Sequence, residues 1–316
     1  MNKEEIFTYI QNYLKEPPLV IWGSGATIDF GLPSMSDLKD EIARKEPTFD
    51  SKCKDLEDEL GKEKYEPILQ EIRKIIRNVI YNADINAKRS LLKNESDFEG
   101  ILNLTKFCFE PHPKVMNVVS TNYDMILEYV WGFYGFKFSD GFQQHELSVF
   151  DEENFGKKEI INLMKVHGSL NWFEIDNEVR KLNSDFGYLP IMIPPGKNKY
   201  RTSHNNPYRE LMQKSDNAIK KANSFLVVGF GFNDEHITPL IIRKIKDGTP
   251  IVVVTKYITS TTIQQLDKAK KVIYVEADET NDNKSRIRIK DNGIIISDSI
   301  EDDSYWRLKN FMKILI

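Results

Sequence analysis

The chain has 316 residues and carries 44 Lys and Arg against 48 Asp and Glu, which gives a formal net charge of −4. Because the two signs are interspersed, we expect no surface built to coat nucleic acid or anionic lipid, and no direct nucleic-acid or membrane binding. Its two cysteines, Cys53 and Cys108, form no CxxC pair, which excludes a disulfide framework and a tetracysteine zinc site. No apolar run is long enough for a membrane span, and residues 1–14 lack the apolar core of a signal peptide, so we expect a cytoplasmic protein.

In residues 1–109 the sequence predicts one strand with helices on either side of it. Residues 1–14 indicate an amphipathic helix, and the apolar run 19–22, bounded by prolines and Gly23, indicates a buried strand. From about residue 36 to 109 the chain is charged and helical in pattern, which predicts a helical subdomain inserted between the first two strands. Its apolar positions recur at helical spacing: Ile68, Leu69, Ile72, Ile75, Ile76, Val79 and Ile80. We interpret this stripe as core, with an interaction surface as the alternative.

Strands and helices alternate from residue 115 onward. Strands are predicted at 115–120, 160–166, 224–229, 250–255 and 271–276. Helices are predicted at 125–134 and 261–270, and parallel strands with helical crossovers make an α/β doubly wound sheet. A C-terminal extension over about 279–316 follows, with a hairpin around Asp291-Asn292-Gly293 and a closing amphipathic helix over 306–315. The whole chain, 1–316, is predicted to form a single domain.

Four short motifs occur directly after strand-like runs. They are Gly23-Ser24-Gly25-Ala26-Thr27, Thr121-Asn122-Tyr123-Asp124, Val166-His167-Gly168-Ser169 and Gly229-Phe230-Gly231-Phe232-Asn233-Asp234. In an open α/β sheet the ligand crevice lies outside the carboxyl ends of the strands, so the four tips predict one shared site. The two glycine-rich tips suit a phosphorylated ligand, because glycine and a following helix N-terminus let backbone N–H groups approach it.

Three of the motifs also have a purely structural interpretation. The glycines at 23 and 25 are compatible with a tight turn, and either Asn122 or Asp124 could cap the helix that follows. His167 ends a strand beside a glycine, where a titratable group reaches a crevice, and histidine is the commonest general base near neutral pH. A lone histidine is also often a satisfied structural residue, so this alternative stays open.

Taken in order, the motifs resemble those of the sirtuin (silent information regulator) superfamily, whose members bind NAD in a Rossmann-like domain. Asp29-Phe30-Gly31-Leu32-Pro33 is similar to a further family motif, and the resemblance covers roughly residues 17–278. Protein-deacylating sirtuins carry a four-cysteine zinc ribbon after the His-Gly motif, whereas here no cysteine follows His167. The segments 168–172 and 229–234 instead resemble the zinc-less bacterial branch, which is similar to NAD-degrading effectors of antiphage defence.

This resemblance implies an NAD glycohydrolase that takes NAD as its substrate, releases nicotinamide and ADP-ribose, and needs no metal. Asn122 would hold the ribose or the attacking water, and His167 would be the general base. Asp124 would lie behind Asn122 and His167 and help to orient them. The other implied contacts are Gly23, Ser24, Gly25, Ala26 and Thr27 to the pyrophosphate, Asp29 and Phe30 at the nicotinamide end, Gly229, Gly231, Phe232 and Asp234 on the adenosine side, and Thr255 near the adenine ribose.

Two other classes of function stay open. The chain could be an NAD-dependent protein deacylase or ADP-ribosyltransferase, against which the missing zinc module argues, or a non-catalytic nucleotide-sensing subunit, against which Asn122 and His167 together argue. The resemblance also implies control by assembly, because a lethal NADase must be held inactive. We expect a homo-oligomer with a separate regulatory partner, such as a HerA-type ATPase or a short Argonaute. The candidate surfaces are the helical insertion (36–109) and the tail (306–316).

Overall fold

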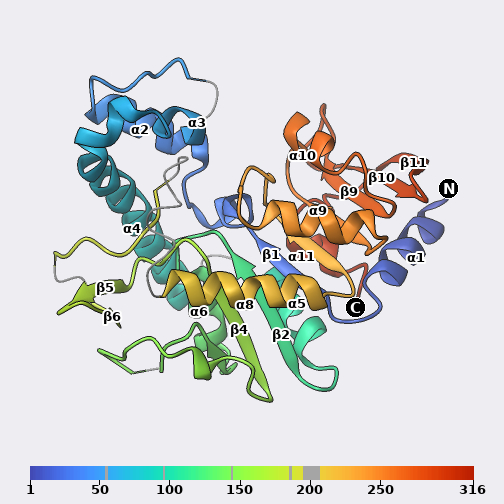
Figure 1. Cartoon of the computed structure of the whole chain (residues 1–316). Helices are drawn as coiled ribbons and strands as arrows, with labels where there is room; N and C mark the ends of the chain where they lie inside the picture. Colours follow the sequence, from blue (N-terminus) through green and yellow to red (C-terminus); the bar gives the residue numbers. More distant parts are fainter. Residues whose placement is uncertain (54–55, 95–96, 144, 185–186, 195–206) are drawn as a thin grey trace.

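A computed structural model describes residues 1–53, 56–94, 97–143, 145–184, 187–194 and 207–316 of the chain. At its centre is a nine-stranded sheet in the order β11-β10-β9-β8-β7-β1-β2-β4-β3 (Figure 1). The strands are β1 (Leu19–Trp22), β2 (Val115–Ser120), β3 (Phe138–Ser139), β4 (Ile160–Lys165), β7 (Phe225–Val228), β8 (Ile251–Val254), β9 (Val272–Ala277), β10 (Ser285–Asp291) and β11 (Ile294–Glu301). All neighbours pair in parallel except β9–β10 and β10–β11. The predicted fold class, a doubly wound α/β sheet with a C-terminal hairpin, is confirmed.

Helices cover both faces of the sheet, and the alternation of side chains along each strand divides the core between them. In β1, Val20 and Trp22 belong to one apolar cluster and Leu19 and Ile21 to the other. The first cluster is completed by α1 (Lys3–Tyr13), α4 (Leu69–Lys93), α5 (Glu99–Phe109), α6 (Ile126–Phe133) and α11 (Leu308–Met312). The second is completed by α8 (Tyr208–Lys221) and α9 (Thr238–Lys246). Strands covered on both faces explain the uninterrupted apolar runs of the sequence.

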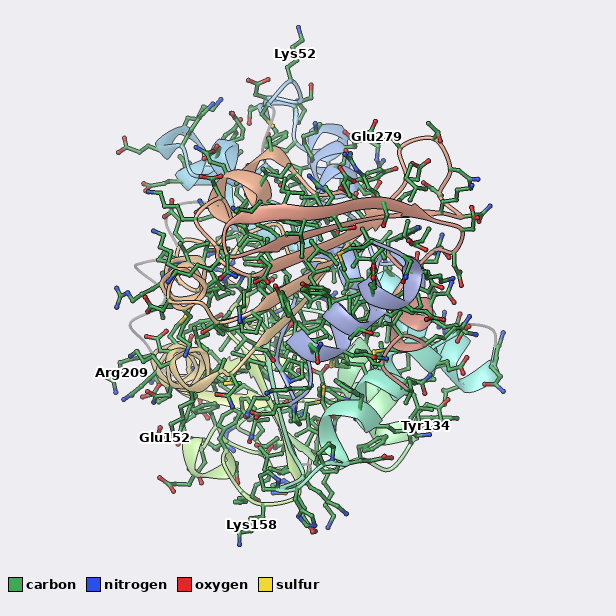
Figure 2. All side chains as sticks on the ribbon, turned by 90° about the vertical axis from the view of Figure 1, so that its right-hand side faces the viewer. Lys52, Tyr134, Glu152, Lys158, Arg209 and Glu279 are labelled. Atoms are coloured by element: carbon green, nitrogen blue, oxygen red, sulfur yellow. The ribbon has the colours of Figure 1, made fainter. Side chains whose placement is uncertain are left out.

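Helices fill the segment between β1 and β2. After two 3₁₀ turns, η1 (Ser24–Ala26) and η2 (Ile28–Phe30), come α2 (Met35–Lys45), α3 (Leu56–Leu60), the 3₁₀ segment η3 (Glu63–Ile68), α4 and α5. In Figure 1, α2 and α3 stand at the upper left and α4 runs from them toward the sheet. Lys52, from this insertion, and Lys158, just before β4, mark opposite ends of the molecule in Figure 2. The apolar stripe of α4 is core, because Ile72, Ile76 and Ile80 are buried in the first cluster.

Some local expectations were wrong. The chain does not enter an α-helix after Gly23 but makes 3₁₀ turns, in which the N–H groups of Ala26 and Thr27 donate to carbonyls three residues back. Two predicted helices are shorter than expected: α10 spans Ser260–Gln265, and α11 spans only Leu308–Met312. After α10 the chain turns, which buries Leu266 and Ala269 against the sheet. The antiparallel hairpin of β5 (Trp172–Ile175) and β6 (Glu178–Lys181) was not predicted.

The C-terminal hairpin belongs to the main sheet. β10 pairs with both β9 and β11, and Asn292-Gly293 makes the turn, as predicted from the sequence. Its inward side chains, Ile287 and Ile289, are fully buried, which explains the alternating pattern of the strand. Among the described helices, none is long and apolar enough to cross a membrane.

Candidate functional site

The four predicted motifs meet at one edge of the sheet. β7, β1, β2 and β4 are consecutive neighbours in the sheet, and each of the four motifs follows the carboxyl end of one of them. The chain order reverses between β1 and β7, the kind of switch point at which α/β sheets bind ligands. A cavity of about 420 Å³ lies at this edge, within the usual size range of small-molecule sites.

All four motifs contribute to the cavity wall. The predicted site residues that line it are Ser24, Gly25, Thr27, Asn122, Asp124, His167, Gly229, Gly231, Asp234 and Thr255. Five other predicted residues do not line it: Gly23, Ala26, Asp29, Phe30 and Phe232. The structure therefore brings the two expected catalytic side chains together and leaves part of the expected binding set outside.

Three of these outlying side chains have other partners. The Oδ1 atom of Asp29 lies 2.8 Å from Nη1 of Arg307 in the tail. The ring of Phe30 stacks on that of Phe98, with centroids 4.5 Å apart. Phe232 is buried and packs against Phe230, with centroids 5.2 Å apart. The expected nicotinamide-end and adenosine-side contacts of these residues thus have no support in their placement.

The glycines of the first and fourth motifs let two loops pack backbone to backbone. The N–H of Gly25 donates to the carbonyl of Gly229 over 2.9 Å. Gly229 has φ +62, and a Cβ atom there would lie 2.0 Å from the nitrogen of Ala26. The N–H groups of Gly23, Gly25, Ala26 and Thr27 all donate to carbonyls of the chain itself. These donors, which a pyrophosphate would use, are already engaged, so the phosphate contact stays a prediction.

Asn122 has a fixed amide and an unused acceptor. Its Nδ2 donates to the carbonyl of Gly23 over 3.1 Å and to Oγ1 of Thr27 over 3.3 Å. Its Oδ1 is buried and has no hydrogen-bond partner among the described residues. Asn122 does not cap α6; instead Asp124 Oδ1 accepts from the N–H of Ile126 over 3.3 Å. Because a buried unpaired acceptor is costly, Oδ1 marks a position at which a ligand hydroxyl would be bound.

A buried lysine holds the loop that carries Asn122. Nζ of Lys165, the last residue of β4, donates to the carbonyl of Asp124 over 2.6 Å. It also lies 2.9 Å from Oε1 of Glu128 and donates to Oγ of Ser169 over 2.7 Å. Only 1% of this lysine is exposed, so its charge is compensated by protein groups rather than by solvent. The contacts tie the second motif to the third.

The insertion also contacts this loop, through a buried carboxyl group on α4. Asp84 accepts a hydrogen bond from the N–H of Met125 over 2.7 Å and one from the hydroxyl of Tyr129 over 2.6 Å. Burial raises the pKa of Asp84. Burial also raises the pKa of Asp124 to about 7, with Lys165 opposing the shift and the nearby acids Asp84 and Glu128 adding to it. The loop of the second motif thus rests on a cluster of acids around one lysine, and of this cluster only Asp124 lines the cavity.

His167, which follows β4, is fixed by contacts of its backbone, of the neighbouring Gly168 and of its own ring. Its carbonyl accepts from the N–H of Ile193 over 2.9 Å. Gly168 has φ +92, and a Cβ atom there would lie 2.1 Å from the carbonyl oxygen of Ile191. The imidazole Nε2 lies 2.7 Å from Oδ2 of Asp234. The His-Gly sequence is therefore explained by a close approach of two chain segments that places the ring in the cavity wall.

Several lining residues were not singled out from the sequence. Tyr123, Phe230 and Asn233 lie inside the motifs themselves, and Tyr257 and Thr259 follow Thr255 at the end of β8. The insertion adds Ser34, Met35, Ser36, Leu38, Lys39, Leu56, Glu57 and Ile80. A strand-end position identifies the first group, but no local pattern distinguishes the second, because only the packing of α2 to α4 brings it to the site. Within the described ranges, no three His, Cys, Asp or Glu side chains are grouped so as to hold a metal ion.

A sequence model of the family described as "SIR2-like domain" matches residues 116–290, which include the second, third and fourth motifs. No curated protein matches the chain. Among solved structures, the chain is similar to Sir2Tm bound to a propionylated peptide, at 13% identity and a TM-score of 0.46, over 84% of this chain and 91% of that one. It is also similar to a Sir2 mutant with a p53 peptide and NAD, at 12% identity and a TM-score of 0.46, over 86% and 92% of the two chains.

Proposed function

Because the chain belongs to the SIR2-like domain family, we propose that it is an NAD-dependent enzyme that hydrolyses NAD to nicotinamide and ADP-ribose. The observation that carries this proposal is the placement of Asn122 and His167 in the wall of one cavity at the switch point of the sheet. The unpaired buried Oδ1 of Asn122 supports it, because a ligand hydroxyl in the cavity would satisfy this acceptor.

The reaction needs few catalytic groups from the protein. Water adds to the anomeric carbon of the nicotinamide ribose, and the bond from that carbon to the pyridinium nitrogen breaks with its electron pair going to nicotinamide. Nicotinamide leaves as a neutral molecule, so no general acid is needed, while the ribose passes through an oxocarbenium-like state. In this proposal Asn122 Oδ1 accepts from a ribose hydroxyl or the water, and His167 takes the proton that the water loses.

We also propose that this activity serves bacterial antiphage defence by depleting NAD. The resemblance of residues 168–172 and 229–234 to the zinc-less bacterial branch supports this role. Expression of the active chain in a bacterial host, with and without phage, tests it through the cellular NAD level. A host whose NAD stays constant under every condition, while the pure enzyme is active, would contradict the role and leave the activity intact.

The experiment for the activity uses the purified full chain with NAD, with and without an acylated peptide and with and without a chelator. We expect equal amounts of nicotinamide and ADP-ribose by chromatography, independent of peptide and chelator. His167→Ala should lower turnover by about 10²–10⁴-fold, the usual effect of losing a positioned proton-transfer group. Asn122→Ala, which removes the acceptor that holds the ribose or the water, should also lower turnover by orders of magnitude. Matched controls are Asn217→Ala and His145→Ala, both at exposed positions.

Three results would contradict the proposal or a part of it. One is transfer of the acyl group to ADP-ribose with no turnover when the peptide is left out, which would indicate a deacylase. Another is near-normal turnover in His167→Ala, which would remove this histidine from the mechanism. Loss of zinc and activity together on chelation would contradict the metal-free chemistry.

A further inference from the structure

The carboxyl group of Asp234 lies against the ring of His167, although the sequence had suggested an adenosine contact for this aspartate. Oδ2 of Asp234 is 2.7 Å from Nε2 of His167, and the two side chains are 3% and 6% exposed. The ring N–H is not aligned on the oxygen in this structure, so the pair is within hydrogen-bonding distance without a complete hydrogen bond. Apo sites often show such loose geometry, which tightens when substrate binds.

The backbone fixes the aspartate from one side. Oδ1 of Asp234 accepts from the N–H of His236 over 2.9 Å and from that of Ile237 over 3.0 Å. These residues lead directly into α9, and the N–H of Thr238 donates to the carbonyl of Asp234 over 3.3 Å. With Oδ1 used in this way, it is Oδ2 that faces the imidazole.

The pair also spans the crevice. His167 follows β4 and Asp234 follows β7, and β1 and β2 lie between these strands in the sheet. Both residues line the same cavity. His167 lies two residues after the end of β4, and Asp234 lies in the loop between β7 and α9, where its bonds to the start of α9 fix it.

We infer that Asp234 is a positioning residue for His167, an inference that rests on the proposed hydrolysis of NAD. By accepting from Nε2–H, the carboxylate holds the neutral ring in the tautomer that carries its proton on Nε2. The lone pair then lies on Nδ1, which takes the proton of the attacking water, and Asp234 faces the imidazolium that results. An orienting carboxylate of this kind contributes up to about 10⁴-fold in kcat in the serine-protease triad.

Asp234→Asn tests this role. The asparagine oxygen can still accept from the two backbone N–H groups, so the start of α9 is retained, but the amide now offers a donor to Nε2. We expect the ring proton to move to Nδ1 and kcat to fall by about 10²–10⁴-fold with little change in KM. Asp247→Asn, an exposed position at the other end of α9, is the matched control and should change neither.

The tautomer is read directly by ¹⁵N NMR of histidine-labelled full-length protein, in which His167→Gln identifies the signals of this ring among the five histidines. Protonation at Nε2 in the wild type and at Nδ1 in Asp234→Asn supports the inference. An Nδ1–H tautomer in the wild type overturns it, whether or not the variant folds. A raised KM with unchanged kcat in Asp234→Asn also overturns it and favours the adenosine contact. If the tautomer changes as expected but no preparation hydrolyses NAD, the proposed function fails while the pairing stands.

Discussion

At the scale of single residues, Asp124 makes the stability of the protein depend on pH near neutrality. Its pKa is raised to about 7, chiefly by burial, whereas an aspartate in an unfolded chain titrates near about 3.9. Between these two values the folded state keeps a proton that the unfolded state loses. The free energy of unfolding therefore falls as pH rises through this window, by at most about 1.4 kcal/mol per pH unit, and no further above it.

Comparison with Asp124→Asn isolates this contribution. The amide has the shape of the protonated carboxyl group and does not titrate, so the variant should be less sensitive to pH. Denaturant unfolding of both proteins from about pH 5 to pH 8 measures the difference, and the other acids of the cluster, Asp84 and Glu128, are present in both. We expect the wild type to lose stability relative to the variant as pH rises. Parallel curves would show that Asp124 is not the titrating group.

Lys165 is expected to be a costly cation to remove, because its ion pair with Glu128 is buried. Lys165→Met leaves Glu128 buried without its partner, and breaking a buried pair in this way typically costs about 3–5 kcal/mol. The control is Lys74→Met on α4, whose pair with Glu71 has a similar length of 2.7 Å but is exposed on both sides. An exposed pair contributes about 0–1 kcal/mol. Equal losses in the two variants, measured by denaturant unfolding, would contradict the structural role given to Lys165.

At the scale of elements, the glycine-rich loops after β1 and β7 interlock, and this is a testable alternative to a phosphate-binding role. Gly229→Ala should destabilise the protein by more than about 1 kcal/mol, because it adds a Cβ atom 2.0 Å from the nitrogen of Ala26 at a positive φ. Gly231→Ala is the control from the same motif, since the nearest atom to its Cβ is Nδ2 of Asn233 at 4.0 Å. Thermal unfolding compares them, and a Gly229→Ala protein as stable as the control would show that the loops can separate.

The helical insertion contacts the loops that form the candidate site. α4 contributes Asp84 to the loop of the second motif, and Nη2 of Arg73 donates to the carbonyl of Met192 over 2.6 Å, beside the segment that contacts Gly168. The apolar stripe of this helix and the buried side of α11, Phe311 and Met312, pack within the chain. These apolar faces are therefore occupied within the chain, and assembly through the insertion or the tail stays a prediction.

At the scale of the whole molecule, we propose that activity is controlled by self-assembly and by a separate partner. Unrestrained hydrolysis of NAD would harm the cell that makes the enzyme, which is the reason to expect such control. Light scattering and turnover measured over the same concentration series test this, and specific activity should rise as the oligomer forms. A monomer with full activity at every concentration and without any partner would contradict it. Apolar side chains that stay exposed include Ile294, Ile295 and Ile300 of β11, the edge strand.

The sequence by itself determined the parallel strands β1, β2, β4, β7, β8 and β9, the hairpin at Asn292-Gly293, and the positions of the four motifs. These follow from local patterns: short uninterrupted apolar runs, which suit the strands of a sheet covered on both faces, and turn residues at the ends of these runs. Because parallel strands share one direction, the motifs at their carboxyl ends also had to lie at a common edge.

Only the tertiary structure decided which side chains meet there. His167 and Asp234 lie 67 positions apart, and no local pattern links them across two intervening strands. Asp29 is paired with Arg307, and Lys165 bonds to the loop of Asp124, because helices and strand ends from distant parts of the chain pack into the same space. Contacts between segments so far apart depend on the packing of the whole core, which residue type and spacing along the chain do not specify.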